Sequence, residues 1–200
     1  MTARLGVVGA AVFAALAGTS CTSANGEQPT STTATSSVSI PSRPRDISLD
    51  NVDPCTLLTE SQRAQLGISR MAQGPDETQT PAPTCAYQVR GPGGNNEGGY
   101  TLGLSPESKR GINDWLNGNG TVNKRLISVS GFPAVQLISM NSKWDNPTGE
   151  FCTTNVSTAD GQELSMDLEP HGKSLTQPQM CDLSKQAAEL ALATLQTLKK

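Results

Sequence analysis

The five cysteines constrain this chain more than any other feature. Cys55, Cys85, Cys152 and Cys181 are spread along the chain after its first quarter, whereas Cys21 stands apart, close behind an apolar run. An odd number of cysteines in an exported protein leaves one thiol to be explained, and setting Cys21 aside leaves an even set. Four cysteines in an oxidising compartment predict two disulfides.

A zinc site is the other common use of four cysteines. No two of them have the short spacing of a zinc knuckle, and the only histidine of the sequence is His171. We therefore expect no metal and no other cofactor.

The first 20 residues have the pattern of a signal peptide. One positive charge, Arg4, precedes the uncharged and mostly apolar segment 5–17, and the small residues Gly18, Thr19 and Ser20 follow it. A bilayer-spanning helix needs roughly 20 apolar residues, so this segment is too short to remain as a span. We expect residues 1–20 to be removed from the mature protein.

The sequence around Cys21 resembles the lipobox of bacterial lipoproteins, in which the cysteine receives a diacylglycerol and becomes the mature N-terminus. Gly18 departs from that pattern, which usually has Leu, Val or Ile three residues before the cysteine. Two buried acyl chains are enough for stable attachment to a membrane. The expectation is a protein anchored through Cys21 to the outer face of the cell membrane, and plain secretion is the alternative.

Residues 21–44 form a segment dominated by Ser and Thr, which lacks the apolar residues needed to bury a core. We expect it to be a lipidated tether that carries one domain, residues 45–200. Without Arg4 the chain has 14 basic and 18 acidic residues, a net charge of −4, and no cluster of basic residues. This charge pattern gives no reason to expect nucleic acid as a partner.

Hydrophobic periodicity predicts an α+β fold with one mostly antiparallel sheet of about five strands and helices packed on it. Alternating apolar residues predict strands over 85–89, 100–104, 151–158 and 162–168. A further extended segment is expected over 126–139, interrupted at Gly131-Phe132-Pro133, where the proline indicates a bulge or an edge position. Capping-box patterns begin predicted helices at Thr59 and Thr176, and Ser105-Pro106 begins another that ends at Gly118.

The turn at Ala159-Asp160-Gly161 leaves two registers open. With a three-residue loop and Gly161 in the left-handed conformation, Leu164, Met166 and Leu168 face Val156, Thr154 and Cys152. This register gathers apolar side chains and turns Cys152 inward, toward Cys181 on the last helix. It favours the pairs Cys152–Cys181 and Cys55–Cys85 among the three connectivities that four cysteines allow.

Few residues suggest a site. His171 lies in a polar turn without an evident orienting partner, as expected for a surface histidine. Asp167 and Glu169 share one strand face, as paired carboxylates do, but outward-facing solvated acids account for them equally well. Trp144, in the polar segment 142–147, is a candidate partner contact, although capping the edge of the core is the commoner use of such a residue.

Several segments together resemble an actinobacterial lipoprotein family called domain of unknown function 3558. These segments are Asp53-Pro-Cys-Thr-Leu-Leu-Thr59, Cys85-Ala-Tyr87, Gly131-Phe-Pro-Ala-Val135, Cys152 with Asp160-Gly161, and Cys181-Asp-Leu before the last helix. The family often has Trp where Tyr87 stands. The resemblance implies an envelope lipoprotein and supplies no catalytic residues.

Two functions are therefore considered. The first is a membrane-tethered binding module that is not an enzyme and holds an envelope protein or a small apolar ligand. It would use the 91–99 loop, the Trp144 turn or an apolar pocket between sheet and helix. The second is an envelope hydrolase with a scattered active site. Buried acids with perturbed pKa values beside His171 favour the hydrolase, and a cleft without such a cluster favours binding.

Overall fold

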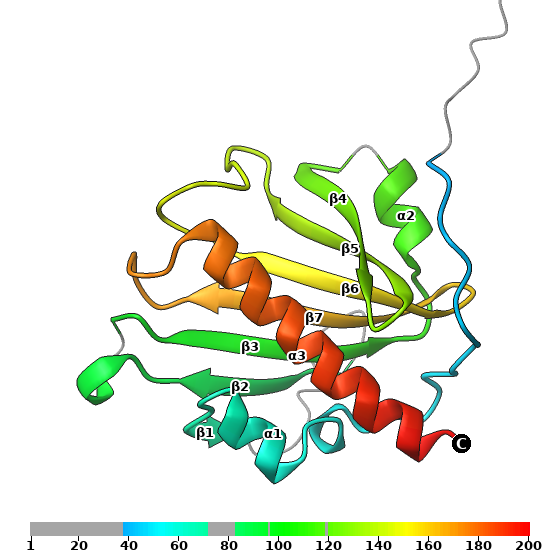
Figure 1. The fold of residues 1–200 in the computed structure, drawn as a ribbon, viewed down its shortest axis with the longest axis horizontal. Coiled ribbons are helices and arrows are strands. Elements are labelled where there is room, and N and C mark those ends of the chain that lie inside the picture. Colours follow the sequence, from blue (N-terminus) through cyan, green and yellow to red (C-terminus); the bar gives the residue numbers. More distant parts are fainter. Residues whose placement is uncertain (1–37, 72–82, 96, 119) are drawn as a thin grey trace, which may run out of the picture. The chain divides into compact units, whose positions relative to one another are not determined.

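The domain is built on one antiparallel sheet, which a computed structural model shows together with its helices (Figure 1). The structure describes residues 38–71, 83–95, 97–118 and 120–200. Within these ranges the sheet has seven strands in the order β1-β2-β3-β7-β6-β5-β4. The strands are β1 (Arg70–Met71), β2 (Cys85–Val89), β3 (Tyr100–Glu107), β4 (Val122–Val129), β5 (Phe132–Ser139), β6 (Cys152–Ala159) and β7 (Gln162–Pro170).

The long C-terminal helix lies diagonally across one face of the sheet (Figure 1). This helix is α3 (Gln177–Leu198), and the shorter ones are α1 (Glu60–Gln65) and α2 (Ile112–Asn117), with 3-10 turns η1 (Pro54–Thr56) and η2 (Pro92–Gly94). Thr176 and Gln179 form the capping box that begins α3. A broad stripe of α3, from Met180 through Ala188 to Leu195, is buried against the sheet, as expected for an amphipathic helix that covers a sheet.

The main core lies between α3 and the sheet. Leu102 and Leu104 of β3 alternate with the side chains of the opposite face, as do Leu164, Met166 and Leu168 of β7, and all five are at most 1% exposed. A second and smaller cluster packs α2 on β5 and consists of Ile112, Leu116, Val135 and Leu137.

The sheet has more strands than the sequence predicted. The segment 126–139 is not one extended strand, because Ser130 and Gly131, at φ 49° and 84°, turn the chain back between β4 and β5. Positive φ at both central residues is the geometry of a tight hairpin turn. Pro133 lies where β5 pairs only with β4, because pairing with β6 begins at Ala134. The two-residue edge strand β1 is the other addition.

The β6–β7 hairpin has the register that gathers apolar side chains. Cys152 faces Leu168, Thr154 faces Met166 and Val156 faces Leu164. Gly161 has φ 66°, and the pairing shifts between Ser157 and Ala159, so the bulged three-residue loop is confirmed. Cys152 consequently points at α3.

The helix predicted from Ser105 to Gly118 is wrong over its first half. Residues 105–107 continue β3 and pair with Ser165, Leu164 and Glu163 of β7. The helix α2 begins only at Ile112, where Asp114 accepts a hydrogen bond from the Gly111 N–H. Pairing along the whole of β7 outweighs the local helix-start pattern of Ser-Pro, because tertiary contacts routinely override propensity.

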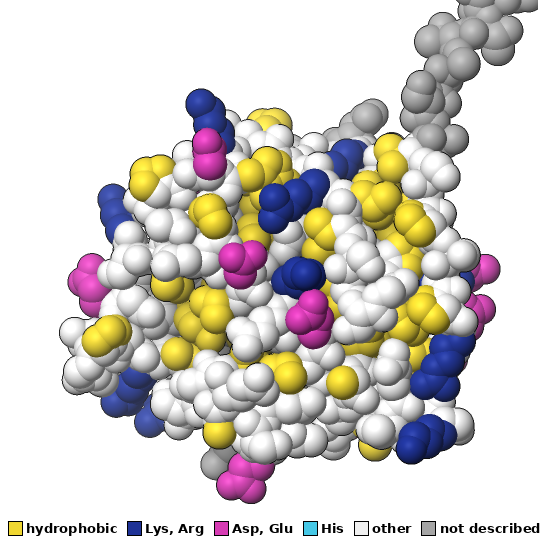
Figure 2. Space-filling view, viewed as in Figure 1, with side chains coloured by type: hydrophobic (Ala, Val, Ile, Leu, Met, Phe, Trp, Pro, Cys, Tyr) yellow, Lys and Arg dark blue, Asp and Glu magenta, His cyan; other side chains and the backbone are white. Residues whose placement is uncertain are grey.

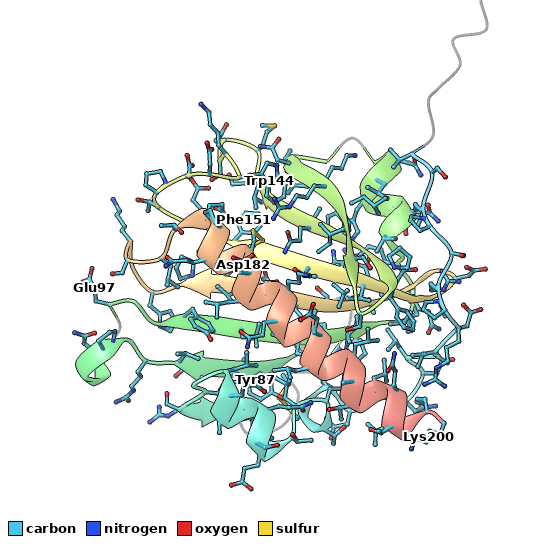
Figure 3. The ribbon with its side chains drawn as sticks, viewed as in Figure 1. Tyr87, Glu97, Trp144, Phe151, Asp182 and Lys200 are labelled. Atoms are coloured by element: carbon cyan, nitrogen blue, oxygen red, sulfur yellow. A yellow bond between two sulfur atoms is a disulfide. The ribbon has the colours of Figure 1, made fainter. Side chains whose placement is uncertain are left out.

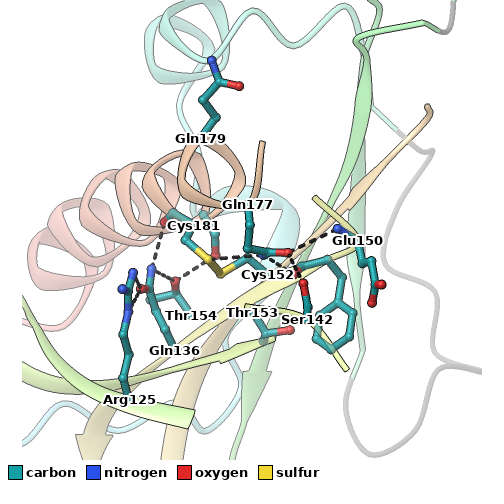
Figure 4. The surroundings of a disulfide bond; sticks show 12 residues. Arg125, Gln136, Ser142, Glu150, Cys152, Thr153, Thr154, Gln177, Gln179 and Cys181 are labelled. Carbon is teal, nitrogen blue, oxygen red and sulfur yellow. Dashed lines mark hydrogen bonds between the residues drawn. A yellow bond between two sulfur atoms is a disulfide. The ribbon is translucent and has the colours of Figure 1, made fainter. Parts of the chain in front are cut away.

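Both disulfides join secondary elements that the main core buries. Cys55 pairs with Cys85 and Cys152 with Cys181, which are the pairs that the hairpin register favoured. Figure 4 shows the second bridge beside Gln136 and Gln177. Gln136 donates to the Cys181 carbonyl at 2.8 Å, and Gln177 donates to the Phe151 carbonyl at 2.7 Å. The start of α3 is therefore fastened to the sheet by covalent and polar contacts together.

Part of the expected tether contacts the folded domain. Ile40 packs against the α2 cluster, and Arg43 donates to Ser157 Oγ at 3.0 Å and to the Asp160 carboxylate at 2.6 Å. The expected signal peptide, Cys21 and the first part of the expected tether lie outside the described residues. In the part of the chain that is described, no helix combines the length and apolar character of a membrane span.

Candidate functional site

A pocket of about 290 Å³ opens on the face of the sheet away from α3. Leu102 and Leu104 point into the core. Successive residues of a strand face opposite sides of the sheet, so Gly103 and Ser105 lie on the face away from α3. A Cβ at position 103 would lie 3.4 Å from the Thr84 methyl carbon, so the glycine gives the pocket depth. The Thr84 and Ser105 hydroxyls hydrogen-bond to each other at 2.6 Å. Ser165 continues this polar floor on β7.

Asp167 is the acid that lines the pocket. Its Oδ1 accepts a hydrogen bond from Thr153 Oγ1 at 2.7 Å. Burial raises the pKa of this carboxyl, and the Thr153 hydrogen bond offsets part of that effect. The expectation of two solvated acids on this strand therefore holds only for Glu169, which is exposed. Asp167 is half-buried because β3 and β6 flank it on both sides.

One wall of the pocket is fixed by a buried carboxylate. Glu163 is 0% exposed and accepts hydrogen bonds from Trp115 Nε1 at 2.8 Å and from Arg110 Nε at 3.0 Å. The Arg110 guanidinium also stacks on the Trp115 ring at 4.5 Å from its centroid. Trp115 and Arg110, both pocket-lining residues, are thus held in position by an acid that lies beneath them.

The pKa of Glu163 is raised to about 7. Burial is the largest cause, the hydrogen bond from Trp115 and the charge of Arg110 oppose it, and the charge of Glu107 adds to it. Glu107 stands directly opposite Glu163 on β3, and burial raises its pKa as well. Two like charges that face each other across antiparallel strands destabilise each other. This pair therefore favours keeping a proton near neutral pH.

The rest of the lining is apolar and comes from the other half of the sheet. Phe151 precedes β6, Val122 begins β4 and Leu137 belongs to β5. The pocket therefore sets a floor of hydroxyl groups and one carboxylate beside a wall of aliphatic and aromatic groups. Such a combination, with few polar groups that fix orientation, is typical of small-molecule sites.

His171 and the buried acids lie far apart. The His171 Nε2 is 2.7 Å from Thr101 Oγ1, and its buried Nδ1 has no hydrogen-bond partner among the described residues. His171 follows Glu163 by eight positions, most of them in β7, which corresponds to about 27 Å along an extended strand. A hydrolytic triad needs a base oriented by a third group, and the described residues supply none to His171.

Trp144 packs against the edge of the main core. The Arg125 guanidinium stacks on its ring at 4.1 Å from the centroid and donates two hydrogen bonds to Gln136 Oε1. Figure 3 shows Trp144 and Phe151 close to the start of α3. This half-buried position suits core capping, and whether Trp144 also contacts a partner stays a prediction.

The surface offers little that points to a metal or to a strongly charged partner. Among the described residues no group of three His, Cys, Asp or Glu side chains is placed to hold a metal ion. Figure 2, which draws the face that carries α3, shows acidic and basic side chains interspersed with apolar ones and no area of a single charge. In the 91–99 loop, which the sequence suggested as a contact segment, a Cβ added at Gly93 or Gly94 would meet no atom within 4 Å, so these positions border open space.

The pocket differs from the one that the sequence suggested. The cavity expected from the sequence was apolar and lay between sheet and helix, whereas this pocket has a mixed polar and apolar lining and lies on the other face. Sequence reasoning missed Thr84, Ser105, Thr153 and Ser165, as well as the clamp formed by Arg110, Trp115 and Glu163. The available signal was that Thr153 and Ser165 stand within two predicted strands, while Thr84 and Ser105 directly flank two others.

Fold and site define a disulfide-bonded α+β domain with a helix on one face of its sheet and a pocket of mixed polar and apolar lining on the other. The chain belongs to the family described as "Protein of unknown function (DUF3558)", whose model matches residues 14–194. No curated protein and no solved structure was found to match the chain.

Proposed function

We propose that this protein is a membrane-tethered lipoprotein of the cell envelope whose domain binds a small ligand in the pocket on the open face of the sheet. The pocket itself is the observation that carries the proposal. Its floor combines unpaired and paired hydrogen-bonding groups of Ser105, Ser165 and Asp167, and its wall is apolar. Such mixed linings are typical of binding sites.

The charged groups of the site support binding rather than hydrolysis. Glu163 has the most strongly shifted acid pKa but is 0% exposed beneath Arg110 and Trp115, so a ligand in the pocket does not reach it. His171 hydrogen-bonds Thr101, well away from Glu163 along β7. A general acid or base has to approach its substrate within hydrogen-bonding distance, and only Asp167 among these three groups lines the pocket.

Blocking the pocket tests the binding function. Gly103→Val places a branched side chain on the pocket floor, next to the Thr84 methyl group. We expect native mass spectrometry of the full-length protein, extracted from its own membranes, to show a small molecule on the wild type that the variant loses. Ser128→Val, at an exposed position of β4, is the matched control and should keep the ligand.

Two results would contradict the binding function. One is a wild-type protein without any bound small molecule, and the other is an equal bound mass on Gly103→Val and the wild type. Thermal melting of each variant establishes that it is folded. If Gly103→Val fails to fold, Ser165→Met is used in its place, because the longer side chain fills the same pocket floor from β7.

Attachment through Cys21 is a separate prediction. The apolar leader, the small residues before Cys21 and a family match that begins at residue 14 support it. Cys21→Ala removes the thiol that would carry the lipid, so we expect the protein to move from the membrane fraction into the medium. Ser23→Ala is the control and should stay with the membrane. Retention of Cys21→Ala in the membrane would show that the anchor lies elsewhere.

A further inference from the structure

The pocket floor holds a group of hydrogen-bonding atoms without partners. Asp167 uses only Oδ1, in its bond from Thr153. Neither Asp167 Oδ2 nor the Ser165 hydroxyl has a hydrogen bond among the described residues. Directly across from Ser165 on β6, the Asn155 amide is buried and has no partner among the described residues, but it does not line the pocket. The unpaired groups that a ligand can reach are therefore Asp167 Oδ2 and the Ser165 hydroxyl, and unpaired polar atoms of this kind call for a ligand or water.

The charges around the floor exclude an anionic ligand. Asp167 makes no ion pair with any described residue, so its negative charge is uncompensated. Among the described residues the cation that lines the pocket is Arg110, which is engaged by Glu163 at 3.0 Å and lies 3.9 Å from Glu107. An anion would meet the Asp167 carboxylate without gaining a free guanidinium.

The groups on the floor match a ligand that both donates and accepts hydrogen bonds. The hydroxyls of Ser105, Ser165 and Thr153 can do both, and the Asp167 carboxylate accepts. An ammonium group only donates and a carboxylate only accepts, so either would satisfy part of this set. Ligand hydroxyl groups would satisfy all of it.

The walls and the volume set the remaining properties of the ligand. Phe151, Val122 and Leu137 offer apolar surface to the C–H groups of a ring. Small-molecule pockets usually measure roughly 300–1,000 Å³, and about 290 Å³ lies at the lower limit of that range. One ring of a compact molecule therefore fits better than an extended chain.

We propose that the pocket binds an uncharged polyhydroxylated ring, such as a single sugar unit, with vicinal hydroxyls on the Asp167 carboxylate and the ring face on Phe151. This inference rests on the proposed binding function and names the ligand class for the same pocket. Two ligand hydroxyls donating to Asp167 would form charge-assisted hydrogen bonds, which are about twice as strong as neutral ones.

A set of sugars that differ only in charge tests the ligand class. Glucose, galactose, mannose and N-acetylglucosamine are the uncharged probes, glucosamine is the cationic one and glucuronate the anionic one. Binding is measured by chemical-shift changes in the NMR spectrum of the full mature chain. We expect at least one uncharged sugar to bind more tightly than both charged ones. Asp167→Asn should weaken that binding at least tenfold, as expected for loss of a charge-assisted hydrogen bond.

Asp182→Asn is the matched control, because Asp182 is an exposed acid on α3, away from the pocket face. This variant should bind the sugar as tightly as the wild type does. Ser165→Ala replaces Asp167→Asn if that variant does not fold. Absence of binding by every uncharged sugar at millimolar concentration overturns the inference, as does tighter binding of glucosamine that depends on Asp167. Either result, together with a small molecule found on the wild-type protein by mass spectrometry, leaves the binding function standing and rejects only the sugar.

Discussion

Replacing both Cys152 and Cys181 by Ala is expected to lower the free energy of unfolding by about 3 to 4 kcal/mol. The bridge spans a sequence separation of 29 residues, and closing a loop of that length removes conformational freedom mainly from the unfolded chain. For a domain of this size the loss corresponds to a fall in melting temperature of roughly 10 °C. Thermal and urea denaturation followed by circular dichroism measure both quantities.

The second disulfide is the internal comparison for this prediction. Cys55 and Cys85 are separated by 30 residues, so the loop-closure contribution of the two bridges is nearly equal. Cys152 and Cys181 are at most 1% exposed, whereas Cys55 is half-buried. Removing the buried pair also leaves unfilled space beneath α3. The Cys152–Cys181 variant should therefore be the less stable of the two, and a larger loss from Cys55 and Cys85 would contradict this account.

Polar contacts around the Cys152–Cys181 bridge should keep α3 docked when the bridge is absent. Gln136 joins Arg125 to the Cys181 carbonyl, and the Ser184 hydroxyl hydrogen-bonds with Thr154 Oγ1 and with the Met166 carbonyl. These hydrogen bonds link α3 with β4, β5, β6 and β7, and those of Ser184 and of Gln136 with Cys181 are buried. The variant is accordingly expected to unfold at a lower temperature but still in one cooperative step.

The sequence predicted those parts of the fold that local patterns determine. The capping boxes at Thr59 and Thr176 begin α1 and α3, and the hairpin register follows from gathering the apolar residues of β6 and β7. The hairpin at Ser130-Gly131 was not predicted, because Ser130 adopts a positive φ that a residue other than glycine seldom takes. Residues 105–107 were misassigned because only pairing with β7 makes them a strand.

The candidate site could not be predicted from the sequence, for a different reason. Its residues come from β3, β4, β5, β6 and β7, from the positions just before β2 and β6, and from the segment before and within α2, and no local pattern states that these strands are neighbours. Strand order places Ser105 beside Ser165 and Asp167 beside Thr153. Only then do separate small polar residues become one floor. The burial of Glu163 could not be predicted for the same reason, because it depends on contacts with Trp115 of α2 and with Arg110 of the loop before α2.

The stability of the domain is expected to fall as the pH rises from about 5 to about 8. The pKa of Glu163 is about 7 in the folded protein, against an ordinary value of 4.5. Between these two values the folded protein keeps a proton that the unfolded chain has released, so increasing pH favours unfolding. The stability present below pH 4.5 is lost as the pH passes through about 7, and the full loss is about 3 kcal/mol. The raised pKa values of Glu107 and Asp167 act in the same direction.

Glu163→Gln should remove most of this pH dependence and make the domain more stable than the wild type at pH 8. The amide oxygen can still accept from Trp115 Nε1 and Arg110 Nε, and the amide N–H groups face Glu107, whose buried Oε2 has no partner among the described residues. Glu169→Gln, on the same strand and the same face but exposed, should leave the wild-type slope unchanged. Urea unfolding at pH 5, 6, 7 and 8 measures the slopes. Equal slopes for Glu163→Gln and the wild type would mean that Glu163 is ionised throughout this pH range. Any pH dependence of the stability would then come from another titratable group of the fold.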